Sequence, residues 1–305
     1  MNCVAVNTSV VKNSVQLQAF LLLSTVLVAC QWWPNHHLIH PEELPDSIST
    51  WSDDHIAQEL LIHLEWAKPP GKGPFPTVIV HPEGGKTAIE MLGVIWDLAE
   101  NGYLAVAVDY KRYDGEEYVR NTFPWRDDED ITKSLDMITA IPYVDKGRVA
   151  VLGFSQGGIF SLLIAAKVSS RLKTVIAYYP VTDFNRWFDK DREDPIERFV
   201  FRKIRQHFYS ESGALSEQEF QKMLYKASAI NFVKTIDVPV LLVHGDEDTS
   251  ASIEESQRLK QRLDEFGKQC ELLIVPGGVH IFNFRQEPQA RVAWMHTLKW
   301  LKRYL

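Results

Sequence analysis

The stretch Gly147–Gly158 reads GRVAVLGFSQGG and decides the fold. Its segment Val149–Leu152 is an unbroken apolar run that favours a buried strand, and the glycines after it allow a sharp turn into a helix. Such a turn pushes the side chain of Ser155 outward and places the backbone N–H of Gln156 at a helix N-terminus, where an oxyanion is favoured. A G-x-S-x-G pentad also arises by chance, but a strand before it and a helix after it indicate a nucleophile turn.

The same alternation of apolar runs and amphipathic stretches continues along the rest of the chain. It predicts a doubly wound α/β fold with a mostly parallel sheet, whose functional loops gather at the carboxyl ends of the strands. Glu59–Trp66 alternates and is expected to form an edge hairpin strand. The predicted buried strands are Thr77–Val80, Leu104–Val108, Val149–Leu152, Thr174–Tyr178, Val238–Val243 and Leu272–Val275. The predicted helices are Thr87–Glu100, Glu129–Ile141, Gly157–Lys167, Glu254–Phe266 and Gln289–Tyr304.

One interval is too long for a simple connection. About sixty charged and aromatic residues separate the strand ending at Tyr178 from the strand beginning at Val238, and a crossover helix needs far fewer. We therefore expect a helical cap insertion at about residues 183–235. Most of its aromatic side chains should pack the cap onto the body, with Trp187 and Phe188 as candidates for lining a substrate pocket.

Two further strands end in loops that carry an acid and a base. The loop after Val238–Val243 contains three competing carboxylates, Asp246, Glu247 and Asp248, any of which can orient an imidazole. The loop after Leu272–Val275 carries His280 behind two glycines, where an imidazole can reach a serine as a general base.

From about residue 58 onward the chain resembles α/β-hydrolases, and most of all the prolyl oligopeptidase catalytic domain and the dienelactone hydrolase-like enzymes. The similarity lies in GRVAVLGFSQGG, in PVLLVHGDED (Pro239–Asp248) and in PGGVHIF (Pro276–Phe282). The resemblance implies the order nucleophile, acid, base on Ser155, Asp248 and His280. Dienelactone hydrolase itself has Cys where Ser155 stands, so the substrate class stays open.

The loop His81–Gly85 (HPEGG) occupies the place where this fold supplies a second oxyanion N–H, and Gly84 is the first candidate for it. It departs from the H-G-G-P of prolyl oligopeptidases. A carboxylate at Glu83 would oppose a developing oxyanion, so this side chain is expected to point away, to pair with a base such as Lys86 or to bind a cationic substrate group. We favour a solvated loop charge for Glu83, with a place in the substrate pocket as the alternative.

The expected function is hydrolysis of carboxylic ester or small acyl-peptide bonds through an acyl-enzyme, without a cofactor. Esters are preferred, because the roughly 28 residues between Cys30 and the first body strand are too few for the propeller of prolyl oligopeptidases. The alternatives are a prolyl oligopeptidase-like serine peptidase and a non-catalytic ligand-binding protein on a hydrolase fold. His36, His37 and His40 are not accompanied by Cys or carboxylate side chains at the spacing of a metal site, so no metal is expected.

Composition narrows the class of protein. The chain has 305 residues, a net charge of −7 and 45% hydrophobic residues, which is ordinary globular composition. It excludes a disordered or multi-span membrane protein, and the mild acidity argues against nucleic acid as a partner. We expect a small ester or short peptide as substrate, and the sequence leaves the oligomeric state open.

The first thirty residues resemble an export signal. Ala19–Cys30 (AFLLLSTVLVAC) is too short to span a membrane but suits a signal peptide, and its end resembles the bacterial lipoprotein box. We expect residues 1–29 to be the signal, Cys30 to be lipidated and residues 30–57 to form a linker or arm. The protein would then be an exported, membrane-anchored lipoprotein, or otherwise periplasmic or secreted. An uncleaved signal anchor and a mis-assigned start codon are the alternatives.

Overall fold

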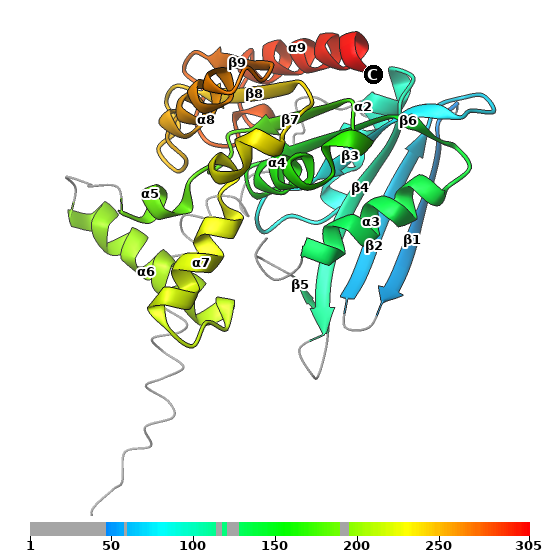
Figure 1. The fold of residues 1–305 in the computed structure, drawn as a ribbon. Coiled ribbons are helices and arrows are strands. Elements are labelled where there is room, and N and C mark those ends of the chain that lie inside the picture. Colours follow the sequence, from blue (N-terminus) through cyan, green and yellow to red (C-terminus); the bar gives the residue numbers. More distant parts are fainter. Residues whose placement is uncertain (1–46, 58–59, 114–117, 121–127, 190–194) are drawn as a thin grey trace, which may run out of the picture.

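The computed structural model describes residues 47–57, 60–113, 118–120, 128–189 and 195–305. In these ranges nine strands form one sheet in the order β1-β2-β4-β3-β6-β7-β8-β9, with β5 paired to β4 (Figure 1). The pairs β1–β2, β2–β4 and β4–β5 are antiparallel, and the other neighbours are parallel. The strands are β1 (Ser49–Ala57), β2 (Leu60–Lys68), β3 (Phe75–His81), β4 (Leu104–Tyr113), β5 (Tyr118–Arg120), β6 (Val144–Phe154), β7 (Thr174–Tyr178), β8 (Val240–Gly245) and β9 (Cys270–Val275).

Helices cover both faces of this sheet. One apolar cluster joins the strands to α3, α4 and α8, and a second joins them to α2 and α9. The α-helices are α2 (Leu92–Glu100), α3 (Asp128–Ala140), α4 (Gln156–Val168), α5 (Phe184–Asp189), α6 (Pro195–Ser212), α7 (Glu217–Ala227), α8 (Glu254–Glu265) and α9 (Gln289–Tyr304). The 3-10 segments are η1 (Ile89–Met91), η2 (Ser169–Arg171), η3 (Ala229–Thr235) and η4 (Phe282–Phe284).

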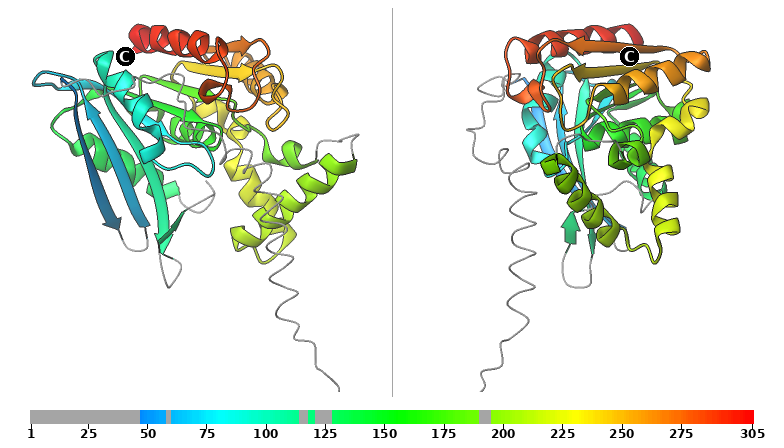
Figure 2. Two further views of the ribbon diagram at one scale, coloured as in Figure 1. Left: turned by 180° about the vertical axis from the view of Figure 1, so that it is seen from behind. Right: turned by 90° about the vertical axis from the view of Figure 1, so that its left-hand side faces the viewer.

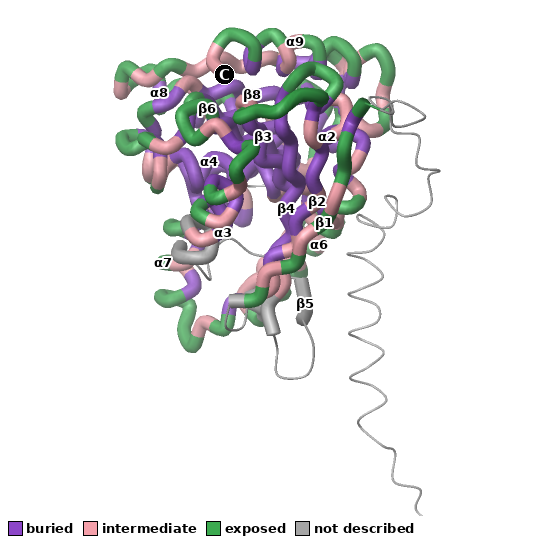
Figure 3. The backbone as a smooth tube through the Cα atoms, turned by 90° about the vertical axis from the view of Figure 1, so that its right-hand side faces the viewer, coloured by how far each residue is buried: buried purple, intermediate pink, exposed green. Residues whose placement is uncertain are grey.

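The alternation of side chains along a strand explains why the apolar runs are continuous. In β4, Leu104 and Val106 enter the cluster with α3 and α4, whereas Ala105 and Ala107 enter the cluster with α2 and α9. A strand that is covered on both faces needs an apolar side chain at every position. Figure 3 shows the result as a buried centre in the strands, surrounded by partly exposed helices.

The order of the strands creates a topological switch point at the carboxyl ends of β3 and β6. The chain leaves β3 through α2 to reach β4 on one side, and then crosses back through α3 to reach β6 on the other side of β3. The loops after β3 and β6 therefore diverge from adjacent strand ends, where His81 pairs in register with Gly153. In open α/β sheets such a switch point is the usual place for a ligand.

Most expected elements are present, and two expectations at the N-terminal edge were wrong. The expected arm 30–57 overlaps β1, which pairs with β2 along the whole length of both strands. Therefore β1 is the edge strand, and the strand expected at the edge is β2 (Leu60–Lys68), which lies one position further in. The polar alternation of Ser49–Ala57 does not indicate a strand clearly, because this segment directly follows the proline-rich segment.

Between β7 and β8 the chain forms four helical segments, α5, α6, α7 and η3. In Figures 1 and 2, α5, α6 and α7 project from the body of the domain, whereas η3 packs against α4 and α8. The buried carboxylate of Glu255 in α8 fixes the start of this insertion, because its Oε2 accepts the backbone N–H groups of Thr182 at 3.0 Å and Asp183 at 2.9 Å. Arg186 of α5 adds an ion pair to Glu255 at 3.3 Å.

No helix within the described ranges combines the length and the apolar character that crossing a membrane requires. The N-terminal apolar run and Cys30 lie outside these ranges, as do His36, His37 and His40.

Candidate active site

Ser155 occupies a strained turn between β6 and α4. Its backbone has φ +50° and ψ −112°, a region that costs an L-residue roughly 1–3 kcal/mol, and its N–H donates to the Tyr178 carbonyl at 2.9 Å. Glycine is required on both sides of the turn. A Cβ on Gly153 would lie 2.0 Å from the Gly157 carbonyl oxygen, and one on Gly157 would lie 2.1 Å from that of His81. The glycines of the pentad therefore allow the close approach that holds the serine outward.

The loops after β6, β8 and β9 bring Ser155, Asp248 and His280 together. The Ser155 Oγ lies 3.0 Å from Nε2 of His280. The other ring nitrogen, Nδ1, lies 2.6 Å from Asp248 Oδ2. Both distances are within hydrogen-bond reach, so a proton can pass from the hydroxyl to the imidazole while the carboxylate fixes the ring. The His280 side chain is 23% exposed, whereas that of Asp248 is fully buried.

Hydrogen bonds hold the Asp248 carboxylate ionised. Burial raises its pKa, but hydrogen bonds from His244 and His280 outweigh burial and lower the pKa to about 2. The other oxygen, Oδ1, accepts the backbone N–H groups of Ser250 and Ala251, each at 2.9 Å. The hydrogen bonds of His244 hold the loop after β8 in place: its Nδ1 lies 2.7 Å from the Ser256 hydroxyl and its Nε2 lies 2.7 Å from the Ala251 carbonyl.

The two competing acids of this loop lie elsewhere. Asp246 is exposed, and its Oδ1 accepts the Gly277 N–H at 2.7 Å, which ties the loop after β8 to the loop after β9. Glu247 is exposed as well. The same two loops touch at Gly245, where an added Cβ would lie 2.0 Å from the Gly278 carbonyl oxygen.

Gly84 and Gln156, the two candidate oxyanion donors, lie close to each other, although they belong to the loops after β3 and β6. A Cβ on Gly84 would lie 3.1 Å from Oε1 of the Gln156 side chain. Gln156 is the first residue of α4, so its backbone N–H lies at the positive end of the helix dipole. The two loops thus lie beside each other next to Ser155.

The expectation that Glu83 is a solvated loop charge was wrong. Glu83 is only 7% exposed, and its Oε2 is buried without a hydrogen-bond partner in the described part of the chain. Burial raises its pKa to about 7, although the positive charges of His280, Lys86 and Arg285 act to lower it. Lys86, the expected partner, lies 2.7 Å from Glu90 instead. The sequence could not show this burial, because it depends on how the loop folds back onto the sheet.

Tyr179 is a site residue that sequence reasoning missed. It follows β7 with a positive φ of +38°, and its ring packs edge-on against His280 at a centroid distance of 4.8 Å. Its hydroxyl donates to Asn283. No motif marks this position, because a tyrosine at the end of an apolar strand also fits a plain core role.

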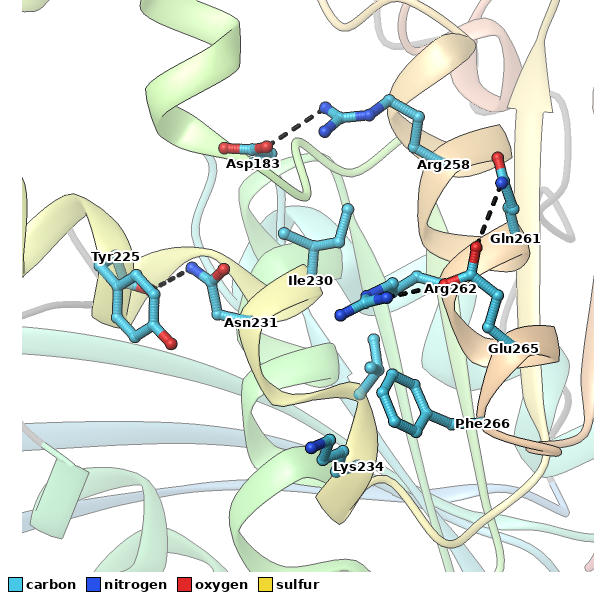
Figure 4. A pocket seen from close by; sticks show the side chains of 11 residues that line it. Asp183, Tyr225, Ile230, Asn231, Lys234, Arg258, Gln261, Arg262, Glu265 and Phe266 are labelled. Carbon is cyan, nitrogen blue, oxygen red and sulfur yellow. Dashed lines mark hydrogen bonds and ion pairs between the residues drawn. The ribbon is translucent and has the colours of Figure 1, made fainter.

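Trp187 and Phe188 lie in the aromatic core of the insertion. Phe188 is 9% exposed and packs against Phe184 and Phe208. Trp187 also reaches the loop that carries Asp248, because its Nε1 donates to the Ser250 carbonyl at 2.9 Å. A separate cavity of about 540 Å³ lies between η3 and α8, lined by Lys234, Arg258 and Phe266 among others, and neither aromatic belongs to it (Figure 4).

His81 and its neighbours have a structural role. His81 is buried, its Nε2 lies 3.2 Å from the Tyr110 hydroxyl, and burial lowers its pKa to about 3. Across the ranges that the structure describes, no group of three or more His, Cys, Asp or Glu side chains has the arrangement of a metal site.

Comparison with known proteins adds to this geometry. The profile of the prolyl oligopeptidase family matches residues 96–305, which is more than half of the chain. The peptidase YtmA of Bacillus subtilis is 26% identical over 201 residues, which cover 65% of this chain and 74% of YtmA.

Two solved structures share the fold at 19% identity. The acylaminoacyl peptidase of Pyrococcus horikoshii superposes with a TM-score of 0.67 over 85% of this chain but only 42% of that protein. The acetyl xylan esterase of Paenibacillus sp. R4 superposes with a TM-score of 0.65 over 94% of both chains.

Proposed function

Because the chain belongs to the prolyl oligopeptidase family and is a serine hydrolase, we propose that it cleaves carboxylic esters or small acyl-peptides through Ser155, Asp248 and His280. The observation that carries the proposal is the continuous contact from the Ser155 hydroxyl through His280 to Asp248, at 3.0 Å and 2.6 Å.

Each of the three side chains has one task. His280 accepts the proton of the Ser155 hydroxyl through Nε2 while the serine oxygen attacks the acyl carbon. The imidazolium that forms is stabilised by the ionised Asp248, and it returns the proton to the leaving group. Water then enters, His280 deprotonates it, and the acyl-enzyme is hydrolysed.

Backbone donors stabilise the negative oxygen of the tetrahedral intermediate. We assign this role to the N–H groups of Gln156 and Gly84, which come from the two loops at the switch point of the sheet. The proximity of Gly84 to Gln156 supports the assignment. Loss of one such donor costs about 100-fold or more in turnover in related chemistry.

Esters are the first choice of substrate. The Paenibacillus acetyl xylan esterase, which superposes over 94% of both chains, supports this choice. The second candidate is peptide hydrolysis, supported by the peptidase YtmA and by the family itself. A panel of p-nitrophenyl esters and aminoacyl p-nitroanilides separates the two, and faster turnover of the anilides would reverse the preference.

The test of the proposal is Ser155→Ala. We expect this variant to stay folded and to lose hydrolysis of every ester that the wild type cleaves. The circular dichroism spectrum is the control for folding. Hydrolysis at the wild-type rate in the folded variant would contradict the assignment.

Export is a further part of the proposal. The run Ala19–Cys30 supports cleavage before Cys30 and attachment of lipid to its thiol, which would anchor the domain to a membrane. Mass spectrometry of the mature chain from a membrane fraction tests it. A chain that keeps residues 1–29 and carries no lipid would contradict it.

A further inference from the structure

Glu83 carries a buried carboxyl group whose Oε2 has no partner among the described residues. The ammonium of Lys86 is engaged by Glu90 at 2.7 Å. Buried polar groups in proteins are almost always hydrogen-bonded, and an unpartnered one calls for a ligand or a function. The mechanism described above does not use this carboxyl.

Its position is next to the reacting atoms. Glu83 directly precedes Gly84, which lies against Gln156, and it is close enough to His280 for the two charges to interact. Ser155 and His280 are themselves partly exposed, so a substrate can reach both side chains.

An ionised carboxylate here would work against catalysis. The tetrahedral intermediate carries a negative charge near Gly84, and a second negative charge beside it raises the energy of that state. A cation that donates N–H groups to Glu83 removes both difficulties, since it satisfies the buried oxygen and neutralises the opposing charge.

We propose that Glu83 selects substrates that carry a protonated amine beside the carbonyl group attacked by Ser155, its carboxylate accepting an N–H from the ammonium. The substrate class is then α-amino esters or short peptides with a free amino terminus. The inference rests on the proposed function, and it adds no covalent step to the reaction.

Two small esters test this selection. Ethyl L-alaninate and ethyl isobutyrate differ by an ammonium in place of a methyl group, and a terminal amine is largely protonated at pH 7. We expect the wild type to favour the alaninate in kcat/KM by about tenfold or more, and Glu83→Gln to reduce that preference by about ten- to 100-fold. Glutamine keeps the shape of the side chain and removes its charge.

Glu247→Gln is the matched control. It removes one negative charge from another loop of the site, but its side chain is exposed. We expect this variant to keep the wild-type preference. If Glu83→Gln fails to fold, wild-type hydrolysis of ethyl isobutyrate is measured with isopropylammonium or with 2-propanol as the inhibitor. Competitive inhibition by the ammonium alone supports the proposal.

The outcomes separate this inference from the function on which it rests. Equal kcat/KM for the two esters, or an unchanged preference in folded Glu83→Gln, overturns the role of Glu83 and leaves ester hydrolysis intact. If the wild type hydrolyses neither ester and isopropylammonium does not protect Ser155 from a fluorophosphonate, both proposals fail.

Discussion

Two loops of the site each bury a carboxyl group near His280, but the two groups differ in their hydrogen-bond donors and in the direction in which their pKa is shifted. Asp248, after β8, receives two backbone N–H groups and hydrogen bonds from two histidines, and its pKa is lowered to about 2. Glu83, after β3, has no donor on Oε2 within the described residues, and its pKa is raised to about 7.

Burial alone therefore does not decide the charge state. Both side chains leave water, and in both cases this raises the pKa. The difference comes from hydrogen-bond donors, which favour the ionised form of Asp248 and which the described residues do not supply to Oε2 of Glu83. A carboxylate that is ionised at every working pH suits the task of orienting His280. A carboxyl group with a pKa of about 7, as at Glu83, suits a group that binds a cationic partner.

The largest expected effect comes from the ionised member of the pair. Asp248→Asn keeps the shape of the side chain but removes the charge that stabilises the imidazolium, and its amide favours the wrong tautomer of His280. We expect turnover to fall about 1,000- to 10,000-fold. Steady-state kinetics on a p-nitrophenyl ester measures the loss.

Glu247→Gln is the control for this prediction, since it removes a charge from an exposed neighbour in the same loop. Its turnover should stay within a few-fold of the wild type. If Glu247→Gln lost as much turnover as Asp248→Asn, the overall negative charge of the loop would determine turnover, and the contact between Asp248 and His280 would not.

A smaller effect is expected on stability at Glu83. Its pKa of about 7 in the folded protein exceeds the ordinary 4.5, so the folded state holds this proton more tightly than the unfolded state. Stability from this group is full below pH 4.5 and is lost as the pH rises through 7. Glu83→Gln should therefore match the wild type at pH 4.5 and exceed it by up to about 3 kcal/mol at pH 8.

Urea unfolding at these two pH values measures that difference. If the gap between the variant and the wild type does not change with pH, Glu83 is not a buried titrating carboxyl and the contrast with Asp248 is lost.

The smallest effect concerns Asp248 in acid. Its pKa of about 2 in the folded protein lies below the ordinary 3.8, so it stabilises the folded state above pH 3.8 and loses this contribution as the pH falls through 2. Between pH 4 and pH 2 the wild type should lose up to about 2 kcal/mol more than Asp248→Asn. Unfolding curves that stay parallel over this interval would contradict the strong hydrogen bonding of Asp248.

The sequence predicts the parts of this structure that depend on local pattern. The strand Thr174–Tyr178 and the helix Gln289–Tyr304 have their predicted bounds, because an apolar run and an amphipathic stretch each end in clear signals. The turn at Ser155 is partly local, since a Cβ on Gly153 would meet the backbone of Gly157 only four residues later.

What the sequence does not predict depends on contacts between distant segments. The burial of Glu83 and the packing of the Tyr179 ring against His280 both depend on contacts between different loops. The edge strand β1 was missed for a related reason, since its pairing with β2 decides its structure more than its own composition does.

The most direct test of the account is labelling with a fluorophosphonate, with the wild type and Ser155→Ala side by side and the modified peptide mapped by mass spectrometry. The reagent reacts with a serine only where a base and an oxyanion site activate it. We expect a single label, on Ser155, that is absent from the variant. A folded wild type that takes no label, or a variant that is labelled as strongly as the wild type, would contradict it.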